Sequence, residues 1–342
     1  MAAKRVIVIG GGVAGMQAAV ALKKQGVTPM LIERDITLGG KLCRWDRLFP
    51  SGTRAGEVVS PLVEAISETG IRTVLCGEVS EIVGDDSRVE VMLTDGSSYE
   101  AEAAIIATGF DLFDASLKEE YGYGIYPNVV TSVDLEEMFR SGAVVRADGS
   151  EPRSVAILHC VGSRDRQAGC GHCSRVCCIT GVKQAIELKQ LYPGCNVYNF
   201  YMDMRMFGSG YEELYKEAQE RYRVNFIRGR ISECSGTMDS RVLVKAEDTL
   251  AGRPLRLTVD MTVLLVGKQA PASNAKFASE LGICVSSDGF FKGADCFDGA
   301  TLTSRRNIFV AGTATGPKNV GESMNEAVAA AIKAAEYVKG LA

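Results

Sequence analysis

The sequence is poor in histidine and tryptophan, with two histidines and one tryptophan among 342 residues. So few imidazoles argue against a histidine-based metal site and against a catalytic triad that needs histidine. The chain has no run of lysine and arginine, and its formal net charge is −4, which argues against nucleic-acid binding. No apolar run reaches the ~18 residues that a membrane-spanning helix needs. We therefore predict neither a nucleic-acid partner nor a membrane span.

What the chain does contain is ordinary globular material for about two domains. It is 46% hydrophobic and 23% charged, so it can bury a sizeable core. The first apolar segment, residues 6–9, ends in glycines and predicts a strand instead of a signal peptide. The chain has eleven cysteines and no such leader, so we predict that the protein is located in the reducing cytoplasm. Clustered cysteines in that compartment are more often metal ligands or redox centres than disulfides.

A glycine-rich turn follows the first apolar segment. Gly10, Gly12 and Gly15 fit the pattern G-x-G-x-x-G, between this strand and a predicted helix at 16–25. The first glycine allows a tight bend, the second lets the backbone approach a pyrophosphate, and the third lets the helix pack on the strand. The free N–H groups of the helix N-terminus then face the phosphates. We include Val13 and Ala14, which lie within this turn, in the predicted nucleotide site.

A carboxylate follows the next predicted strand, at 28–32. Glu33 stands where an acid accepts hydrogen bonds from the adenosine ribose, and its neighbour Arg34 is included in the site. An acid at this place favours an unphosphorylated ribose, as in FAD or NAD. A tight turn that binds no ligand is the alternative interpretation.

Three further segments favour FAD over NAD. Residues 38–41 (LGGK) resemble the FAD-contacting turn of two-dinucleotide-binding flavoproteins, and 103–109 (AAIIATG) resemble the ATG turn of that superfamily. Residues 307–312 form a strand that enters a glycine turn before a predicted helix at 322–338. In that superfamily this turn holds the ribityl chain, and the helix dipole faces the N1/O2 edge of the flavin and stabilises its reduced form. The remaining predicted FAD-binding residues are Gly39, Gly40, Lys41, Val79, Ala107, Thr108, Gly109, Gly312, Thr313 and Lys318.

A second βαβ unit begins after Pro152, with a strand at 154–159. The pattern then predicts a helix at 174–191, strands at 196–201 and 261–266, a helix at 211–222 and a β-meander within 228–260. The segment 110–153 is loop-rich by its pattern, with one short helix at 133–139. The predicted fold class is α/β with two interleaved Rossmann-like lobes. The lobes are an FAD-binding lobe of residues 1–115 plus 270–342, a crossover at 116–150, and an inserted NAD(P)-domain-like lobe at 151–269.

A cysteine cluster stands where the second lobe would carry its own glycine turn. Four cysteines are spaced as C-x12-C-x3-C-C, namely Cys160, Cys173, Cys177 and Cys178. They could hold a [4Fe–4S] cluster or a structural zinc ion, or Cys173 and Cys177 could form a redox dithiol. Neighbouring helical side chains diverge by about 100°, which a zinc ion tolerates poorly and a wider cubane accepts. We favour the cluster over these alternatives and over ordinary buried thiols.

The other cysteines are left out of the ligand set. Cys170 lies between Gly169 and Gly171, where we expect a flexible loop. The rest are scattered among apolar and turn residues, as is typical of ordinary thiols: Cys43, Cys76, Cys195, Cys234, Cys284 and Cys296.

The same stretch bears on nicotinamide binding. An NAD(P)H site would need G-x-G-x-x-G after the strand at 154–159, but the chain offers a single glycine, Gly162, and then the charged residues 164–166. We therefore predict no NAD(P)H site in the second lobe.

These motifs together resemble HdrA, the A-type component of heterodisulfide reductases, and its counterpart in quinone-modifying oxidoreductases. The matching segments are IGGGVAGMQAA (9–19), LGGK (38–41), CVGSRDR (160–166), CSRVCC (173–178), YMDMR and FGSGYEELY (201–215), FIRGR (226–230) and VAGTATGPK (310–318). The resemblance implies a fold like that of thioredoxin and glutathione reductases, bound FAD and an iron–sulfur centre at the four cysteines. It also implies HdrB-like and HdrC-like partner subunits and a homodimer.

The chain departs from larger family members. They carry an N-terminal cluster domain and C-terminal ferredoxin modules, and a cysteine-bearing loop after a Phe-Pro dipeptide. In this sequence Phe49-Pro50 is followed by residues 51–54 without a cysteine. The resemblance therefore implies a short form that lacks a second cluster, as in sulfur-oxidising complexes, and argues against electron bifurcation.

The sequence thus predicts an oxidoreductase, a cytoplasmic FAD- and [4Fe–4S]-containing electron-transfer subunit in dissimilatory sulfur metabolism, with no side chain acting as a catalytic acid or base. One alternative is an autonomous FAD-dependent disulfide oxidoreductase that uses Cys173 and Cys177. A non-enzymatic alternative is a zinc-stabilised scaffold subunit.

Overall fold

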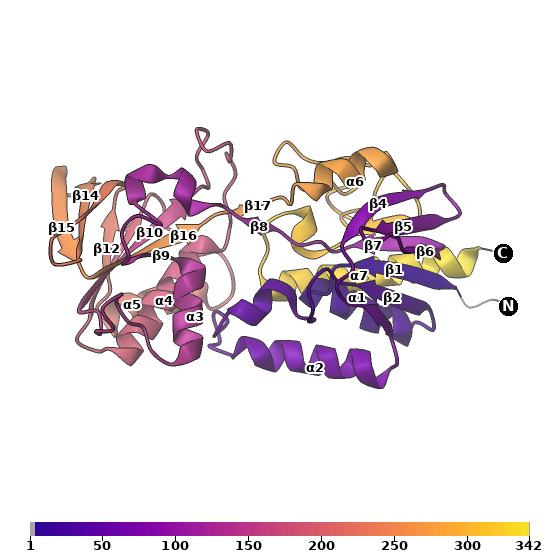
Figure 1. Ribbon diagram of the computed structural model, residues 1–342, viewed down its shortest axis with the longest axis horizontal. Helices are drawn as coiled ribbons and strands as arrows, with labels where there is room; N and C mark the ends of the chain where they lie inside the picture. The colour runs from indigo at the N-terminus through magenta and orange to yellow at the C-terminus, as the bar shows by residue number, and fades with distance from the viewer. Residues whose placement is uncertain (1–3, 342) are drawn as a thin grey trace. The chain divides into compact units, whose positions relative to one another are not determined.

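The computed structural model describes residues 4–341, which divide into two compact units. The first comprises the described parts of Met1–Cys43, Ala55–Asp111 and Gln269–Ala342, and the second comprises Arg44–Arg54 and Leu112–Lys268. Each unit is built on its own five-stranded parallel sheet (Figure 1).

The sheet of the first unit has the order β18-β7-β1-β2-β3. Its central strand β1 (Arg5–Ile9) is a run of β-branched residues that are fully buried after Arg5, as expected for a parallel strand covered on both faces. β1 pairs in parallel with its two neighbours. The other strands are β2 (Thr28–Ile32), β3 (Arg72–Val74), β7 (Ala103–Ile106) and β18 (Ile308–Val310).

Helices cover this sheet. The alanine-rich helices α1 (Val13–Lys24) and α7 (Val320–Gly340) pack against each other, and α2 (Ala55–Glu68) packs against α1. α6 (Ser273–Leu281) packs against β4 of a three-stranded antiparallel sheet, β4 (Val79–Gly84), β5 (Val89–Leu93) and β6 (Ser98–Ala101). Short elements complete the unit and its borders: η1 (Gly40–Arg44), η4 (Gly312–Thr315), β8 (Asp111–Leu112) and β17 (Lys268–Gln269).

The sheet of the second unit repeats this plan, with the order β12-β11-β10-β16-β9. Its central strand β10 (Ser154–Val161) is buried after its first residue. The other strands are β9 (Val129–Thr131), β11 (Asn196–Tyr201), β12 (Asn225–Arg228) and β16 (Met261–Val266). The helices are α3 (Ser132–Ser141), α4 (Cys177–Leu191) and α5 (Tyr211–Glu220), with the turns η2 (Ala115–Leu117) and η3 (Glu119–Tyr121).

In both units a three-stranded antiparallel sheet is inserted just before a strand that neighbours the central one, namely β7 beside β1 and β16 beside β10. In the second unit this sheet is β13 (Ile231–Gly236), β14 (Val242–Asp248) and β15 (Arg253–Val259), and it confirms the predicted meander. The counterpart β4–β6 was not predicted, although its alternating burial is visible in β5. The two sheets and two meanders therefore make an architectural duplication, with β1 and β10 in matching central positions.

Apart from shifts of a few residues at 112–115 and at 269, the units differ from the predicted lobes at two places. Residues 116–150 are not a crossover between lobes, because β9 pairs with β16 and so completes the second sheet. Residues 44–54, predicted to belong to the FAD-binding lobe, are part of the second unit.

A buried ionic network explains why residues 44–54 join the second unit. Lys183 of α4 contacts both Glu136 of α3, at 2.6 Å, and Glu187, at 2.9 Å, and all three side chains are buried. The Lys183 ammonium also donates to the carbonyl of Arg47, at 3.1 Å, and the Glu136 carboxylate accepts the Asp46 N–H, at 3.1 Å. The segment is thus held by charged groups that α3 and α4 present to it.

One ammonium serves two carboxylates in this network, so a negative charge remains uncompensated. Burial raises the pKa of Glu187 to about 7, although Lys183 opposes the rise. The folded protein therefore holds the Glu187 proton more tightly than the unfolded chain does. The contribution of the protonated Glu187 to the free energy of unfolding therefore falls as the pH rises from the ordinary glutamate pKa toward 7.

We expect Glu187→Gln to stabilise the protein above pH 7. The substitution removes a buried negative charge, and Lys183 keeps Glu136 as its ion-pair partner. The gain in free energy of unfolding should be on the order of 1–3 kcal/mol at pH 8 and should shrink below pH 5. Denaturant titrations at several pH values measure it. The matched control is Glu220→Gln, at a side chain 68% exposed, and it should change stability little at any pH. A loss of stability in Glu187→Gln at pH 8 would contradict this account.

Candidate functional site

The first candidate site is the turn between β1 and α1. Gly10 has a φ of +108°, and a Cβ there would lie 2.4 Å from the Ala107 carbonyl oxygen. A Cβ on Gly15 would lie 1.7 Å from the Gly10 carbonyl oxygen. Both positions therefore require glycine, one for the turn and one for the contact between helix and turn.

Gly12 has a different role, because a Cβ there would meet nothing within 4 Å. It is the N-cap of α1 and its residue type offers no side-chain cap, so the first N–H groups of the helix are available to a ligand. Open space in front of an uncapped helix N-terminus fits a phosphate group. The surroundings of Gly10, Gly12 and Gly15 are thus compatible with a nucleotide-binding turn.

Glu33 closes this turn from the side. Its buried carboxylate accepts the N–H of Gly11 through one oxygen and the N–H of Asp35, at 2.9 Å, through the other. Position 11 must also be glycine, which the motif did not predict. A Cβ there would lie 2.6 Å from the Leu38 side chain and 2.8 Å from the Glu33 carboxylate. The exposed Arg34 follows Glu33 directly.

The LGGK segment lies against the same turn. The N–H of Gly39 donates to the Gly11 carbonyl, at 2.9 Å, and a Cβ on Gly40 would lie 3.0 Å from the Gly12 Cα. Lys41 is held between Asp111, at 3.5 Å, and the ring of Phe110, at 5.3 Å from its centroid. Burial lowers the pKa of Lys41 despite the nearby Asp111 carboxylate.

The remaining predicted FAD-binding residues lie at the ends of three other strands, β4, β7 and β18. Ala107 follows β7 and contacts Gly10, as described above. Thr108 lies 3.4 Å from Asn274 through its hydroxyl, and Gly109 has a φ of +80° with the Thr313 hydroxyl 3.8 Å from its Cβ position. Val79 begins β4, two residues after Gly77, whose N–H donates to the Glu33 carbonyl at 2.8 Å.

The glycine turn after β18 also approaches α1. Gly312 has a φ of +68°, and a Cβ there would lie 2.6 Å from the Cβ of Ala14. Lys318 follows this turn and precedes α7, which begins with a capping box between Asn319 and Glu322. The structure therefore gathers the predicted FAD-binding residues at the carboxyl edge of one parallel sheet, where α/β proteins bind ligands.

The second candidate site is the matching turn between β10 and α4. Cys160 has a φ of +62° and lies at an irregularity of β10, between Leu158 and Val161. Cys177 and Cys178 are the first two residues of α4, whose N-terminus has no side-chain cap. Three of the four predicted ligands thus lie where the first unit has its glycines.

These three thiols contact one another and are buried. Cys177 hydrogen-bonds with both Cys160 and Cys178, and this lowers the pKa of Cys160 and of Cys178 while it raises that of Cys177. Burial opposes both decreases. His159, also buried, adjoins Cys178 and binds Asn199 through its Nε2 at 2.9 Å. A group of thiols that stabilises thiolate in this way suits soft metal ions.

Cys173, the fourth predicted ligand, is less buried than the other three. Its sulfur accepts the N–H of Arg175 at 3.4 Å. Cys160 and Cys173 both raise the pKa of the Arg164 guanidinium through their charges. Within residues 4–341, no three Cys, His, Asp or Glu side chains are arranged to ligate a single metal ion.

The prediction of a flexible loop around Cys170 is wrong. Cys170 is 2% exposed and exchanges two backbone hydrogen bonds with Asp165, at 2.8 and 3.0 Å. Asp165 is clamped by Lys118, at 3.0 Å, and Arg230, at 2.9 Å, and hydrogen bonding from Lys118 lowers its pKa to about 2. The Cys170 sulfur lies 3.5 Å from Nδ1 of His172. Long-range ion pairs, which sequence spacing does not reveal, order this loop.

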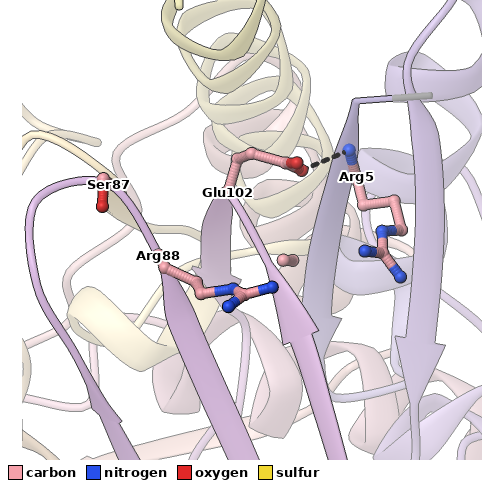
Figure 2. Close-up of a pocket in the computed structure, with 5 residues that line it drawn as sticks. Arg5, Ser87, Arg88 and Glu102 are labelled. Carbon is pink, nitrogen blue, oxygen red and sulfur yellow. Dashed lines mark hydrogen bonds between the residues drawn. The ribbon is translucent and has the colours of Figure 1, made fainter. Parts of the chain in front are cut away.

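A surface pocket in the first unit carries no functional assignment. It is lined by Arg5, Ser87, Arg88, Ala101 and Glu102, and Figure 2 shows the Glu102 carboxylate turned to the Arg5 N–H, at 2.7 Å. Arg5 begins β1, so this pocket lies at the end of the strand remote from the glycine turn.

Among the helices of residues 4–341, none combines the length and the apolar character that a membrane span requires.

Comparison with known proteins agrees with this geometry. Residues 4–145 match the pyridine nucleotide-disulphide oxidoreductase family. The chain is 32% identical to an A-type iron–sulfur component of the CoB–CoM heterodisulfide reductase of Methanopyrus kandleri, over 96% of this chain and 63% of that protein. It is 31% identical to the corresponding A-type component of Methanocaldococcus jannaschii, with the same two coverages.

The chain is a homologue of the A-type heterodisulfide reductase component, HdrA. This confirms the resemblance inferred from the motifs. The chain spans about 63% of the length of these relatives.

Solved structures confirm the predicted fold class. The thioredoxin reductase of Lactococcus lactis superposes with a TM-score of 0.71 at 20% identity, covering 99% of this chain and all of that one. The thioredoxin reductase of T. acidophilum superposes with a TM-score of 0.68 at 18% identity, covering 97% of each chain. The fold is that of two-dinucleotide-binding flavoproteins.

The contrast between Gly12 and Gly15 predicts opposite responses to the same substitution. Gly15→Ala should destabilise the protein by about 1–3 kcal/mol, the usual cost of forced overpacking, because its methyl group meets backbone. Gly12→Ala should leave the stability of the cofactor-free protein nearly unchanged. Thermal and denaturant unfolding of both variants, after removal of any bound nucleotide, measure this. Equal destabilisation would show that the turn differs from the one described.

Proposed function

We propose that this chain is an FAD- and [4Fe–4S]-containing electron-transfer subunit of a heterodisulfide-reductase-like complex in dissimilatory sulfur metabolism. Its partners would be HdrB-like and HdrC-like subunits, which carry the substrate chemistry, and the chain would form a homodimer. The observation that carries the proposal is the use of one architectural position for two kinds of site: glycines after β1 and clustered cysteines after β10.

The residues of the first unit fit FAD. The open space at Gly12, the uncapped α1 N-terminus and the buried Glu33 together match a dinucleotide's pyrophosphate and ribose. Asp35 and Gly11 donate their N–H groups to the Glu33 carboxylate and so hold it in place beside the turn. Lys41, Gly312 and Lys318 would complete the site on the flavin side.

The donor set of the second unit fits an iron–sulfur cluster. Cys160 near the end of β10, Cys173 in the following loop, and Cys177 and Cys178 at the start of α4 offer four sulfur ligands, and sulfur is the ligand that such clusters take. The free N–H groups at the start of α4 favour negative charge there. Arg205 also donates its N–H to Cys178, and such hydrogen bonds to sulfur tune a cluster.

When bound, FAD exchanges electrons in pairs and an iron–sulfur cluster exchanges them singly, so the two groups convert one kind of transfer into the other. The chain's own residues would bind and orient these groups. The turn glycines and the helix N-terminus would hold phosphate, and Glu33 would select an unphosphorylated ribose. Three buried cysteines and the less buried Cys173 would hold the cluster. No side chain need donate or accept a proton from a substrate.

The two alternatives have weaker support. A dithiol of Cys173 and Cys177 is disfavoured because the Cys177 thiol is engaged with Cys160 and Cys178. A zinc-stabilised scaffold is disfavoured because Cys177 and Cys178 are adjacent residues of α4, and neighbouring helical side chains diverge by about 100°, which a single zinc ion accepts less readily than a wider cubane does.

The decisive experiment is anaerobic purification followed by analysis of flavin, iron and acid-labile sulfide. The proposal requires one FAD and four iron atoms for each chain. A yellow protein without iron would support the disulfide oxidoreductase instead, and a colourless protein that contains zinc would support the scaffold.

The ligand set predicts different outcomes for neighbouring cysteines. Replacing Cys173, Cys177 or Cys178 by Ala should abolish the paramagnetic signal of the reduced cluster and leave FAD bound, because the first unit holds it. Cys170→Ala is the matched control from the same loop and should keep the signal. If Cys170→Ala removes the signal while Cys178→Ala keeps it, the ligand set is wrong even though a cluster is present.

Nicotinamide coenzymes should reduce the isolated protein slowly or not at all. At the end of β11, where a Rossmann fold holds the ribose carboxylate, Asp203 instead pairs with Arg164 at 2.7 Å. Arg164 itself stands in the turn where the glycines would be. Stopped-flow measurement of flavin absorbance after mixing with NADH or NADPH tests this, and rapid bleaching at micromolar NADH would refute it.

A further inference from the structure

A carboxylate that was not among the predicted FAD-binding residues contacts the loop 312–318, which carries the last three of them. Glu326, in the second turn of α7, has a side chain only 13% exposed. Its two oxygens lie 3.2 and 3.3 Å from the Thr315 hydroxyl, and one lies 3.4 Å from the Lys318 ammonium. The N–H of Gly312 also donates to it. All four residues belong to the first unit.

This carboxylate therefore contacts both ends of the loop 312–318. Gly312 is the end that lies against Ala14 of the phosphate-binding helix. Lys318 is the other end, and its ammonium also donates to the Thr315 hydroxyl, so the side chain is folded back on the loop and is 17% exposed. Contacts with Thr315 and Glu326 thus hold the Lys318 ammonium in place.

Burial makes the ionised form of the Glu326 carboxylate less favourable than it would be in water. Burial raises its pKa, although Lys318 opposes the rise. An uncharged amide of the same shape could accept the Gly312 N–H and contact Thr315, so the hydrogen bonds alone do not require an acid. The charge matters mainly to Lys318, because a mostly buried ion pair acts in a medium less polarisable than water.

We propose that Glu326 is a positioning residue for Lys318 and that its charge lowers the reduction potential of the bound FAD. The inference rests on the proposed FAD site. The positive end of the α7 dipole and the Lys318 ammonium both favour the negative charge that reduction adds to a flavin. A carboxylate paired with Lys318 offsets that effect and holds the ammonium on the loop.

The test is a redox titration of the flavin absorbance in the purified protein and in Glu326→Gln. The variant should retain FAD at the wild-type content and show a more positive potential. Glu336→Gln is the matched control: it lies on the same helix and pairs with Lys333 at 3.2 Å, but both side chains are about half exposed. It should leave the potential unchanged. Lys318→Met should make the potential more negative.

A double-mutant comparison tests whether Glu326 acts through Lys318. In the Lys318→Met background, Glu326→Gln should raise the potential less than it does alone. An equal rise in both backgrounds, an unchanged potential, or loss of FAD from Glu326→Gln alone would each overturn the inference. Wild-type protein without FAD would instead refute the proposed function, so the two failures are distinguishable.

Discussion

The structure depends on one constraint that it meets twice: a helix that follows the central strand of a parallel sheet begins with N–H groups that have no partner within the helix. In both units this helix N-terminus stands at the carboxyl edge of the sheet, and neither α1 nor α4 has a side-chain cap. In the first unit glycines leave the space before it open. In the second, Cys160 and the first two residues of α4 place sulfur there. The same backbone arrangement thus leaves open space at the helix start in one unit and places cysteine side chains there in the other.

Buried charge sets the limits of each unit. Lys183 and Glu136 attach residues 44–54 to the second unit, and the clamp on Asp165 by Lys118 and Arg230 orders the loop that carries Cys170. In the first unit Glu326 attaches the loop 312–318 to α7. The first two cases join segments that are far apart in the sequence, whereas the third ties a loop to the helix that follows it. Such pairs help to select one arrangement because an unpartnered charge in the same place would be costly.

Local patterns were sufficient for much of the fold. Apolar runs of four to six residues predicted the central strands to within a residue or two, and the glycine spacing predicted the tight turn between β1 and α1. Helix starts were less accurate: α4 begins at Cys177 and not at 174, because the residues before it form a turn in which Arg175 has a φ of +58°. The antiparallel sheet β4–β6 was missed even though β5 alternates between buried and half-buried residues.

The sequence by itself determined the two strand-turn-helix units, their glycines and cysteines, and the homology to HdrA, because these depend on residue type at short spacing. Only the tertiary structure decided where the units divide, that Gly11 must be glycine, that Cys170 is buried and that Glu326 reaches Lys318. Those features arise from contacts of the folded chain, most of them between residues distant in the sequence. Spacing along a sequence carries no record of such contacts, since they exist only once the sheets have formed and brought their loops to a common edge.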